Sequence, residues 1–190
     1  MPNDHAAGRS RRVPTYAIAF ARRRDLPQLA SIELGAARLL TGHAPAPVLA
    51  EVTSLEELET ARRQQLLWVA LADDAPVGFA HVKLLEARSA HLDELDVHPD
   101  HGRRGVGRQL VMTVCDWAAA KGYATVTLST FRDPPWNMPF YARLGFDVIA
   151  PDDLSPALIA VVADEQSRGL DPMRRVVMVR RTDAYLPACR

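Results

Sequence analysis

Hydrophobic and polar positions follow two different periods along this chain. Short apolar runs that are rich in β-branched and aromatic residues, and that are bounded by turn residues, predict strands. Runs with apolar residues three and four positions apart predict helices. The expected strands span residues 15–23, 66–73, 75–87, 89–97, 124–130, 147–151 and 173–181. The expected helices span residues 26–40, 54–64, 105–121, 135–145 and 155–169.

Residues at the ends of these segments support the boundaries. Asp25 can cap the first helix with its side chain. Ser54, followed three residues later by Glu57, forms a capping-box pattern at the start of the second helix. Gly122 is a stop signal for the third helix. A Pro-rich stretch at residues 41–52 predicts a loop between the first two helices.

The order of the expected elements predicts an α/β protein with a mixed sheet. The chain has 190 residues, enough for one domain with a full core. We expect this domain to span residues 15–182, between a polar, flexible N-terminal tail at 1–14 and a C-terminal tail at 183–190. The N-terminal tail lacks the apolar core of a signal peptide.

Composition narrows the class of function. Hydrophobic residues make up 48% and charged residues 24% of the chain, as in a soluble globular protein. The 23 basic and 23 acidic side chains give a formal net charge of +0, which argues against nucleic acid as a partner. No apolar run approaches the ~20 residues of a membrane helix. Cys115 and Cys189 imply no disulfide framework, so a cytoplasmic location is expected.

A basic, Gly-rich turn joins the fourth strand to the third helix. Gly105 and Gly107 permit close approach of a ligand to the free N–H groups at the helix start, so this turn predicts a phosphate or pyrophosphate site. The turn also supplies three arginines that suit phosphate: Arg103, Arg104 and Arg108. It is not a P-loop, which needs Lys-Ser or Lys-Thr after Gly107. It is a poor dinucleotide motif, because Leu110 stands three residues after Gly107 and several strands come first.

The segment "VHPDHGRRGVGRQLV", residues 97–111, resembles the signature Gln/Arg-x-x-Gly-x-Gly/Ala of the GCN5-related N-acetyltransferases. Gly105 and Gly107 match its small positions, whereas Gly102 replaces the Gln or Arg of its first position. The segments "DLPQLASIE", "PVGFAHV" and "FYARLGF" resemble other elements of the family, so the similarity runs over about residues 16–146. The resemblance implies a mixed, mostly antiparallel, twisted sheet of about seven strands flanked by helices. It also implies acetyl-CoA as the cosubstrate, without a metal.

The resemblance assigns roles to residues at the matching positions. Tyr141 resembles the family's acid, which protonates the leaving thiolate. The family often has an Asn seven residues before this Tyr; Pro134 stands there, and Asn137 is a weaker candidate for a CoA contact. The fourth strand offers backbone groups to the acetyl and pantetheine arm, and the turn holds the pyrophosphate. The expected cofactor-binding residues are Leu95, Asp96, Val97, Arg103, Arg104, Gly105, Val106, Gly107, Arg108 and Asn137.

The base is expected on the strand "HLDELDV", residues 91–97. Strict alternation places His91 and Asp93 on one face of this strand. A carboxylate and an imidazole on one face form a plausible base site, and the family often has a Glu or a His at these positions. Glu94 and Asp96 fall on the other face, where we interpret them as polar residues of a sheet surface in contact with water.

These features predict an N-acetyltransferase in which the amine attacks acetyl-CoA directly. Two other readings stay open: a non-catalytic acyl-CoA-binding module, and a nucleotide-binding enzyme. The acceptor is a small amine, an amino acid, an aminoglycoside-like drug or a protein N-terminus. A homodimer is common in the family, and no membrane partner is expected.

Overall fold

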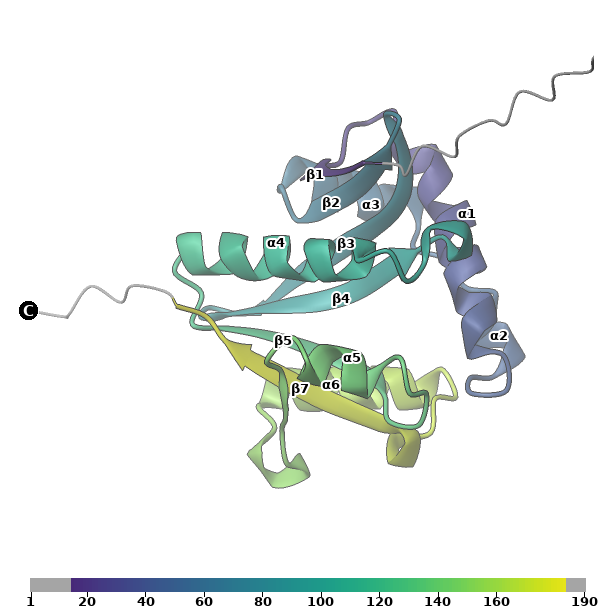
Figure 1. Cartoon of the computed structure of the whole chain (residues 1–190). Helices are drawn as coiled ribbons and strands as arrows, with labels where there is room; N and C mark the ends of the chain where they lie inside the picture. Colours follow the sequence, from purple (N-terminus) through teal and green to yellow (C-terminus); the bar gives the residue numbers. More distant parts are fainter. Residues whose placement is uncertain (1–14, 184–190) are drawn as a thin grey trace, which may run out of the picture.

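The computed structural model describes residues 15–183, and it contains one seven-stranded sheet flanked by helices (Figure 1). The predicted fold class is confirmed. The strands are β1 (Tyr16–Phe20), β2 (Leu67–Ala72), β3 (Ala75–Glu86), β4 (Ser89–Val97), β5 (Thr125–Phe131), β6 (Asp147–Val148) and β7 (Arg175–Arg181). The helices are α1 (Leu26–Ala37), α2 (Ala46–Leu49), α3 (Leu55–Arg63), α4 (Val106–Ala120), α5 (Met138–Ala142) and α6 (Pro156–Ser167). Short 3₁₀ turns cover Arg38–Leu40, Pro99–His101, Pro151–Asp153 and Pro172–Arg174.

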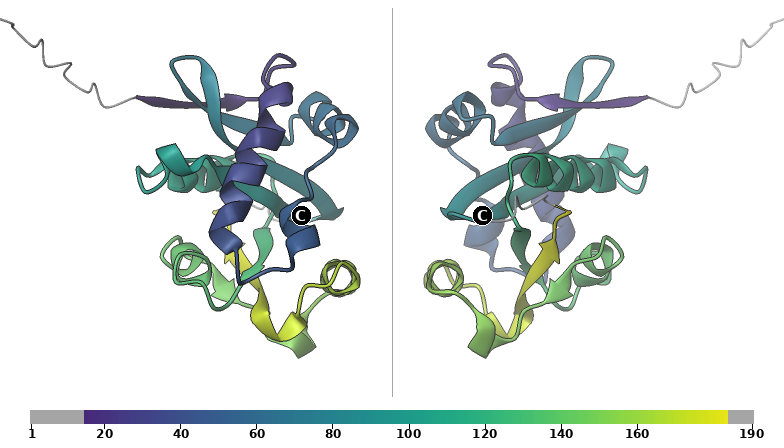
Figure 2. Two further views of the ribbon diagram at one scale, coloured as in Figure 1. Left: turned by 90° about the vertical axis from the view of Figure 1, so that its right-hand side faces the viewer. Right: turned by 90° about the vertical axis from the view of Figure 1, so that its left-hand side faces the viewer.

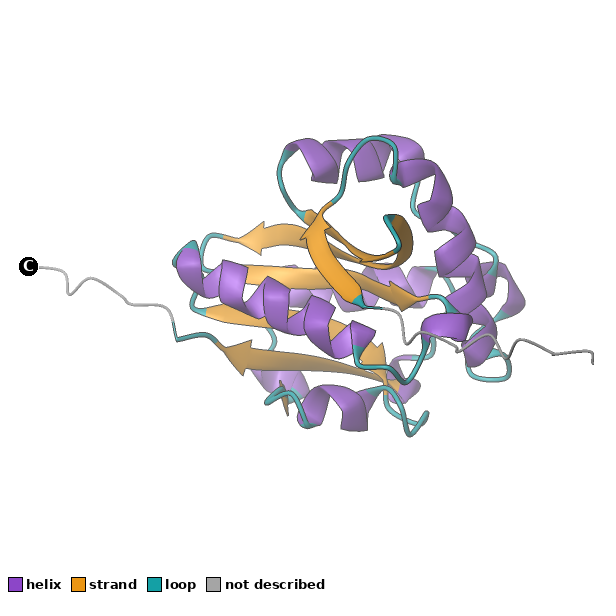
Figure 3. Ribbon diagram, turned by 45° about the horizontal axis from the view of Figure 1, so that its top comes forward, coloured by secondary structure: helices purple, strands orange, loops and turns teal. Residues whose placement is uncertain are grey.

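The strand order in the sheet is β1-β2-β3-β4-β5-β7-β6. Neighbouring strands run antiparallel except β4 and β5, which are parallel. A parallel pair needs a crossover connection, and α4 supplies it by running across one face of the sheet (Figure 3). The β4–β5 ladder ends at the pair Leu92–Leu128, although both strands continue beyond it. The two strands are therefore not paired with each other over their last residues, in the middle of the sheet, although β4 stays paired with β3 and β5 with β7.

Helices cover both faces of the sheet. Figure 2 shows α4 and α5 on one side and α3 and α6 on the other, and α1 packs on β3, β4 and α3. The inner stripe of α4 matches the predicted helical period, and its buried residues are Val106, Leu110, Val111, Val114, Cys115 and Ala118. Strand β2 is buried along its whole length. No helix within residues 15–183 combines the length and the apolar character that crossing a bilayer requires.

Several local predictions can be compared with the structure. The Ser54 cap is confirmed, since its Oγ accepts a hydrogen bond from the Glu57 amide at 3.1 Å. Gly122 follows the C-cap of α4 with a φ of +83°, as a stop signal requires. The Asp25 cap is wrong, because its carboxylate instead accepts hydrogen bonds from the backbone and side chain of Arg22. The predicted loop at 41–52 contains the short helix α2. The tails at 1–14 and 184–190, with Cys189, lie outside the described residues.

Candidate active site

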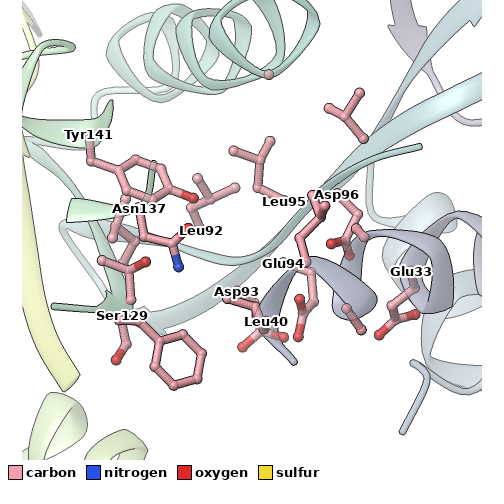
Figure 4. A pocket seen from close by; sticks show the side chains of 18 of the residues that line it. Glu33, Leu40, Leu92, Asp93, Glu94, Leu95, Asp96, Ser129, Asn137 and Tyr141 are labelled. Atoms are coloured by element: carbon pink, nitrogen blue, oxygen red, sulfur yellow. The ribbon is translucent and has the colours of Figure 1, made fainter. Parts of the chain in front are cut away.

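A cavity of about 1440 Å³ lies where β4 and β5 separate (Figure 4). Its wall includes the ends of both strands, the turn before α4, the start of α5, and residues of α1 and α6. This volume exceeds the ~300–1,000 Å³ that is usual for small-ligand sites. The cavity is therefore large enough for two reactants at once.

The turn before α4 is shaped for an anion. Gly105 is the N-cap of α4 and has a φ of +81°, a conformation that favours glycine. A Cβ built on Gly105 would meet no atom within 4 Å, so open space lies beside it. No side chain within the described residues caps this helix start, so its first N–H groups are free to bind a ligand. Gly107 packs closely, with Phe140 Cζ 3.6 Å from the position of a Cβ.

The predicted contacts of this turn divide into two sets. Arg103, Gly105, Val106, Gly107 and Arg108 all line the cavity. Arg104 does not; its guanidinium lies 3.4 Å from the hydroxyl of Tyr16 on β1. The sequence showed three arginines in one basic turn but not their directions, because adjacent residues of a tight turn point to different sides.

Tyr141 comes from α5 and faces the ends of β4 and β5. Its ring packs against Phe140 and Phe146, with centroid distances of 5.0 and 5.9 Å, and its hydroxyl points into the cavity (Figure 4). Burial raises the pKa of Tyr141 above its usual range, and the carboxylates of Asp96 and Glu94 raise it further. The phenol is therefore held neutral, as a proton donor must be.

Strand β4 carries a bulge at Asp93. His81 of β3 pairs with Glu94, but the next residue, Val82, pairs with Leu92, so Asp93 has no partner across the ladder. A bulge adds one residue and re-aims the side chains around it. The predicted alternation, which placed His91, Asp93, Leu95 and Val97 on one face, is therefore interrupted at Asp93.

His91 and Asp93, the two predicted base residues, both line the cavity but are held by other groups. His91 is buried, and its Nδ1 lies 2.9 Å from the hydroxyl oxygen of Thr127. Burial lowers the pKa of His91. Asp93 Oδ2 lies 2.9 Å from the ammonium nitrogen of Lys83 and 3.6 Å from His81 Nδ1.

The bulge directs Glu94 and Asp96 toward the cavity, which corrects the prediction that both lie on a wet outer face of the sheet. Their carboxylates lie between Tyr141 and Glu33 of α1 (Figure 4). Burial raises the pKa of both carboxyls well above their ordinary values; Asp96 and Asp93 raise that of Glu94 further, and Glu33 raises that of Asp96. Asp96 Oδ2 is buried and has no hydrogen-bond partner within the described part of the chain. Sequence periodicity could not find these groups, because it assumes an unbroken strand.

The remaining predicted residues also reach the cavity. Leu95, Val97 and Asn137 line it, and the Asn137 side chain points into it beside Tyr141 (Figure 4). Asn137 is the N-cap of α5 but makes no side-chain cap hydrogen bond, so its amide is available to a ligand. Trp136, next to it, is 48% exposed and meets the ring of His43 edge-on.

Comparisons with known proteins identify the family and agree with the fold. The model of the Acetyltransferase (GNAT) family matches residues 36–146. PaiA N-acetyltransferase from Thermoplasma acidophilum, in complex with coenzyme A, is similar with a TM-score of 0.70 and 19% identity, covering 88% of this chain and 99% of that chain. N-acetylglutamate synthase from Neisseria gonorrhoeae, complexed with coenzyme A and N-acetylglutamate, has a TM-score of 0.67 and 21% identity, covering 90% of this chain and 36% of that chain. The ribosomal-protein-S18-alanine N-acetyltransferase from Escherichia coli has a TM-score of 0.64 and 19% identity, covering 93% of this chain and 99% of that chain. At these identities the likeness to solved structures shows a shared fold.

Proposed function

Because this chain belongs to the acetyltransferase (GNAT) family, we propose that it transfers the acetyl group of acetyl-CoA to a primary amine by direct attack in a ternary complex. One observation carries the proposal: a free helix N-terminus with Gly105, the phenol of Tyr141 and unpaired carboxylates of β4 all line the same cavity. These are an anion cradle, an acid and a base within one space. The proposed reaction assigns no role to a metal ion.

The wall of the cavity fits acetyl-CoA. The open space beside Gly105 and the free N–H groups of α4 suit the pyrophosphate, with Arg103 and Arg108 as charged donors. Residues 95–97 of β4, on the edge that no longer pairs with β5, offer backbone groups to the pantetheine arm. Asn137, at the N-terminal end of α5, offers an additional polar contact. A CoA thioester supplies an activated acyl group, and the chain supplies the proton transfers.

Tyr141 is the proposed acid, which protonates the leaving thiolate sulfur. Its raised pKa keeps the proton on the hydroxyl at neutral pH. Cys115, the free cysteine among the described residues, is buried in the stripe of α4, and burial raises its thiol pKa. It does not line the cavity, so a covalent acyl-enzyme through this thiol has no support.

Glu94 is the proposed base, which takes the proton of the attacking amine directly or through water. It is preferred over Asp93, whose carboxylate pairs with Lys83, and over His91, which is buried and whose Nδ1 lies 2.9 Å from the Thr127 hydroxyl. A general base works best when its pKa lies near the working pH, and burial raises the pKa of Glu94 from its ordinary value in that direction. Asp93 and His91 then serve as supports of the bulged strand.

Thiol release from acetyl-CoA with a panel of amines tests this function, with the product mass as confirmation. Tyr141→Phe should lower kcat by ~10²–10⁴-fold, the usual contribution of one acid catalyst, and leave CoA affinity near that of the wild type. The second candidate function, a non-catalytic acyl-CoA-binding module, requires CoA binding without thiol release for any amine. A Tyr141→Phe variant within a few-fold of the wild type would remove Tyr141 from the mechanism. The cytoplasmic location and the homodimer stay predictions.

A further inference from the structure

Within the described residues, six lysine and arginine side chains line the cavity. Arg103 precedes α4, Arg108 lies in the first turn of α4, and Arg143 follows α5. The others are already held by acidic side chains within the described part of the chain, in the pairs Lys83–Asp93, Arg168–Glu51 and Arg175–Glu165. Near the end of β4, the three acidic groups that remain take no part in the ion pairs found within residues 15–183, although burial, which raises the pKa of Glu94, is partly offset by the charge of Arg168.

Three carboxyl groups form that remaining set, called here the carboxylate cluster: Glu33 of α1 with Glu94 and Asp96 of β4. One oxygen from each lies within 4.8 Å of those of the other two. Glu33 accepts hydrogen bonds from the Thr53 amide at 3.0 Å and from its hydroxyl at 3.1 Å. None of the ion pairs found within residues 15–183 involves a member of the cluster, and the buried Asp96 Oδ2 has no hydrogen-bond partner there.

Such a cluster needs positive charge when its members are ionised, because like charges this close repel and burial penalises them further. The reacting amine cannot supply that charge throughout the reaction, since it must lose its proton before it attacks the thioester. A second cationic group, which stays charged during turnover, satisfies both conditions. Figure 4 shows the cluster extending away from Tyr141 toward Glu33, so such a group would lie farther from the acid than the reacting amine.

We propose that the carboxylate cluster binds the second cationic group of the acceptor, so that the acceptor is an aliphatic diamine or polyamine. This inference rests on the proposed acetyl transfer and specifies its substrate class. Ala36, Ala37, Leu39 and Leu40, which follow Glu33 in the chain, also line the cavity, and their aliphatic side chains suit the methylene chain between two amino groups. An acceptor with a carboxylate in the same place would face three acidic groups.

Three amines of equal chain length test the charge preference: 1,4-diaminobutane, 4-amino-1-butanol and 4-aminobutanoate. Their distal groups are positive, neutral and negative, and the reacting amine is the same. We expect kcat/KM, measured by thiol release, to be at least about tenfold higher for the diamine than for the amino alcohol, as for a charge-assisted hydrogen bond. The amino acid should be the poorest. Calorimetric titration of 1,4-diaminobutane into the protein with CoA gives a readout that is independent of turnover.

Two variants test whether the carboxylate cluster causes the preference for a positively charged distal group. Glu33→Gln and Asp96→Asn should each weaken diamine binding about tenfold and bring the ratio of kcat/KM between diamine and amino alcohol close to one. Asp116→Asn is the matched control, because it removes one exposed carboxylate from α4 outside the cavity and should keep the wild-type ratio.

The outcomes separate the two proposals. If no amine in a broader panel releases thiol, the proposed acetyl transfer fails. If amines release thiol but the three distal groups give equal kcat/KM, only the diamine inference fails. Three close carboxyl groups can also bind a divalent metal ion. Calorimetric titrations with Ca²⁺ and Mg²⁺ test that alternative. Ion binding that Asp96→Asn abolishes, without any diamine preference, would overturn the inference in favour of a metal site.

Discussion

The carboxylate of Asp93 is held by the ammonium group of Lys83, with 2.9 Å between Oδ2 and Nζ. Lys83 lies on β3 and also pairs with Glu57 at 2.9 Å, so it ties α3 to the bulge of β4. The next residue, Glu94, lines the same cavity without an ion-pair partner among the described residues. Asp93 is thus paired with a cation and the adjacent Glu94 is not. For this reason we expect Asp93 to support the strand and Glu94 to act as the base.

The base assignment predicts that Glu94→Gln lowers kcat by ~10²–10⁴-fold. A base acts only when it is deprotonated, so the rate of the wild type should fall as the pH drops through the raised pKa of Glu94, above its ordinary value of 4.5. Glu94→Gln should remove this acidic limb from the pH–rate profile, whereas Asp93→Asn and His91→Gln should keep it. Profiles with two amines of different pKa identify any limb that belongs to the substrate. Loss of the limb in Asp93→Asn instead would return the base role to Asp93.

The anion cradle predicts that Gly105→Val greatly weakens CoA binding, because a side chain would fill the open space beside the helix N-terminus. The valine also strains a backbone with a φ of +81°. Gly122→Val is a matched control at the other end of α4: its φ is +83° and a Cβ there also meets no atom within 4 Å. Both variants should lose similar stability in thermal unfolding, but only Gly105→Val should lose affinity by calorimetry. Equal CoA affinity in the two would refute the cradle.

The arginines of the turn should differ in their contribution to CoA binding. Arg103 and Arg108 line the cavity, so Arg103→Ala and Arg108→Ala should each weaken binding by about tenfold, the size of a charged hydrogen bond. Arg104→Ala should bind CoA like the wild type, because that guanidinium faces Tyr16. Affinities measured at two salt concentrations check this, since loss of a phosphate contact also reduces the salt dependence. A large defect in Arg104→Ala would contradict the observed orientation.

The carboxylate cluster should lower the free energy of unfolding at neutral pH. A carboxyl whose folded-state pKa is raised binds its proton more tightly in the folded state, so stability decreases as the pH rises through the unfolded and folded values. Asp96→Asn should therefore raise the melting temperature at pH 8, by about 2–4 °C for each kcal/mol recovered, and change it much less at pH 4. Thermal unfolding at both pH values, with Asp116→Asn as the control, measures this. A variant that is less stable than the wild type at pH 8 would show that the Asp96 carboxylate stabilises the fold.

The sequence by itself determined the strands, the longer helices, their order and the position of the anion-binding turn. These features depend on local properties: the apolar period of α4, the β-branched residues of β5, the Ser54 cap and the paired glycines Gly105 and Gly107. A resemblance that covers several such elements in order was sufficient to predict the sheet and to place Tyr141 near the turn. Each of these local features depends on a few neighbouring residues, so it can be predicted from the amino-acid sequence.

Tertiary structure alone decided which charged groups converge. The bulge at Asp93 depends on how β4 pairs with β3, and it changes the direction of Glu94 and Asp96 without any mark in the residue pattern. Glu33, 61 positions before Glu94, joins them only because α1 packs on β4. Strand register and helix packing are set by contacts between distant segments. For that reason the periodicity of one strand could propose a base on β4, but could not identify which of its carboxylates has no ion-pair partner among the described residues.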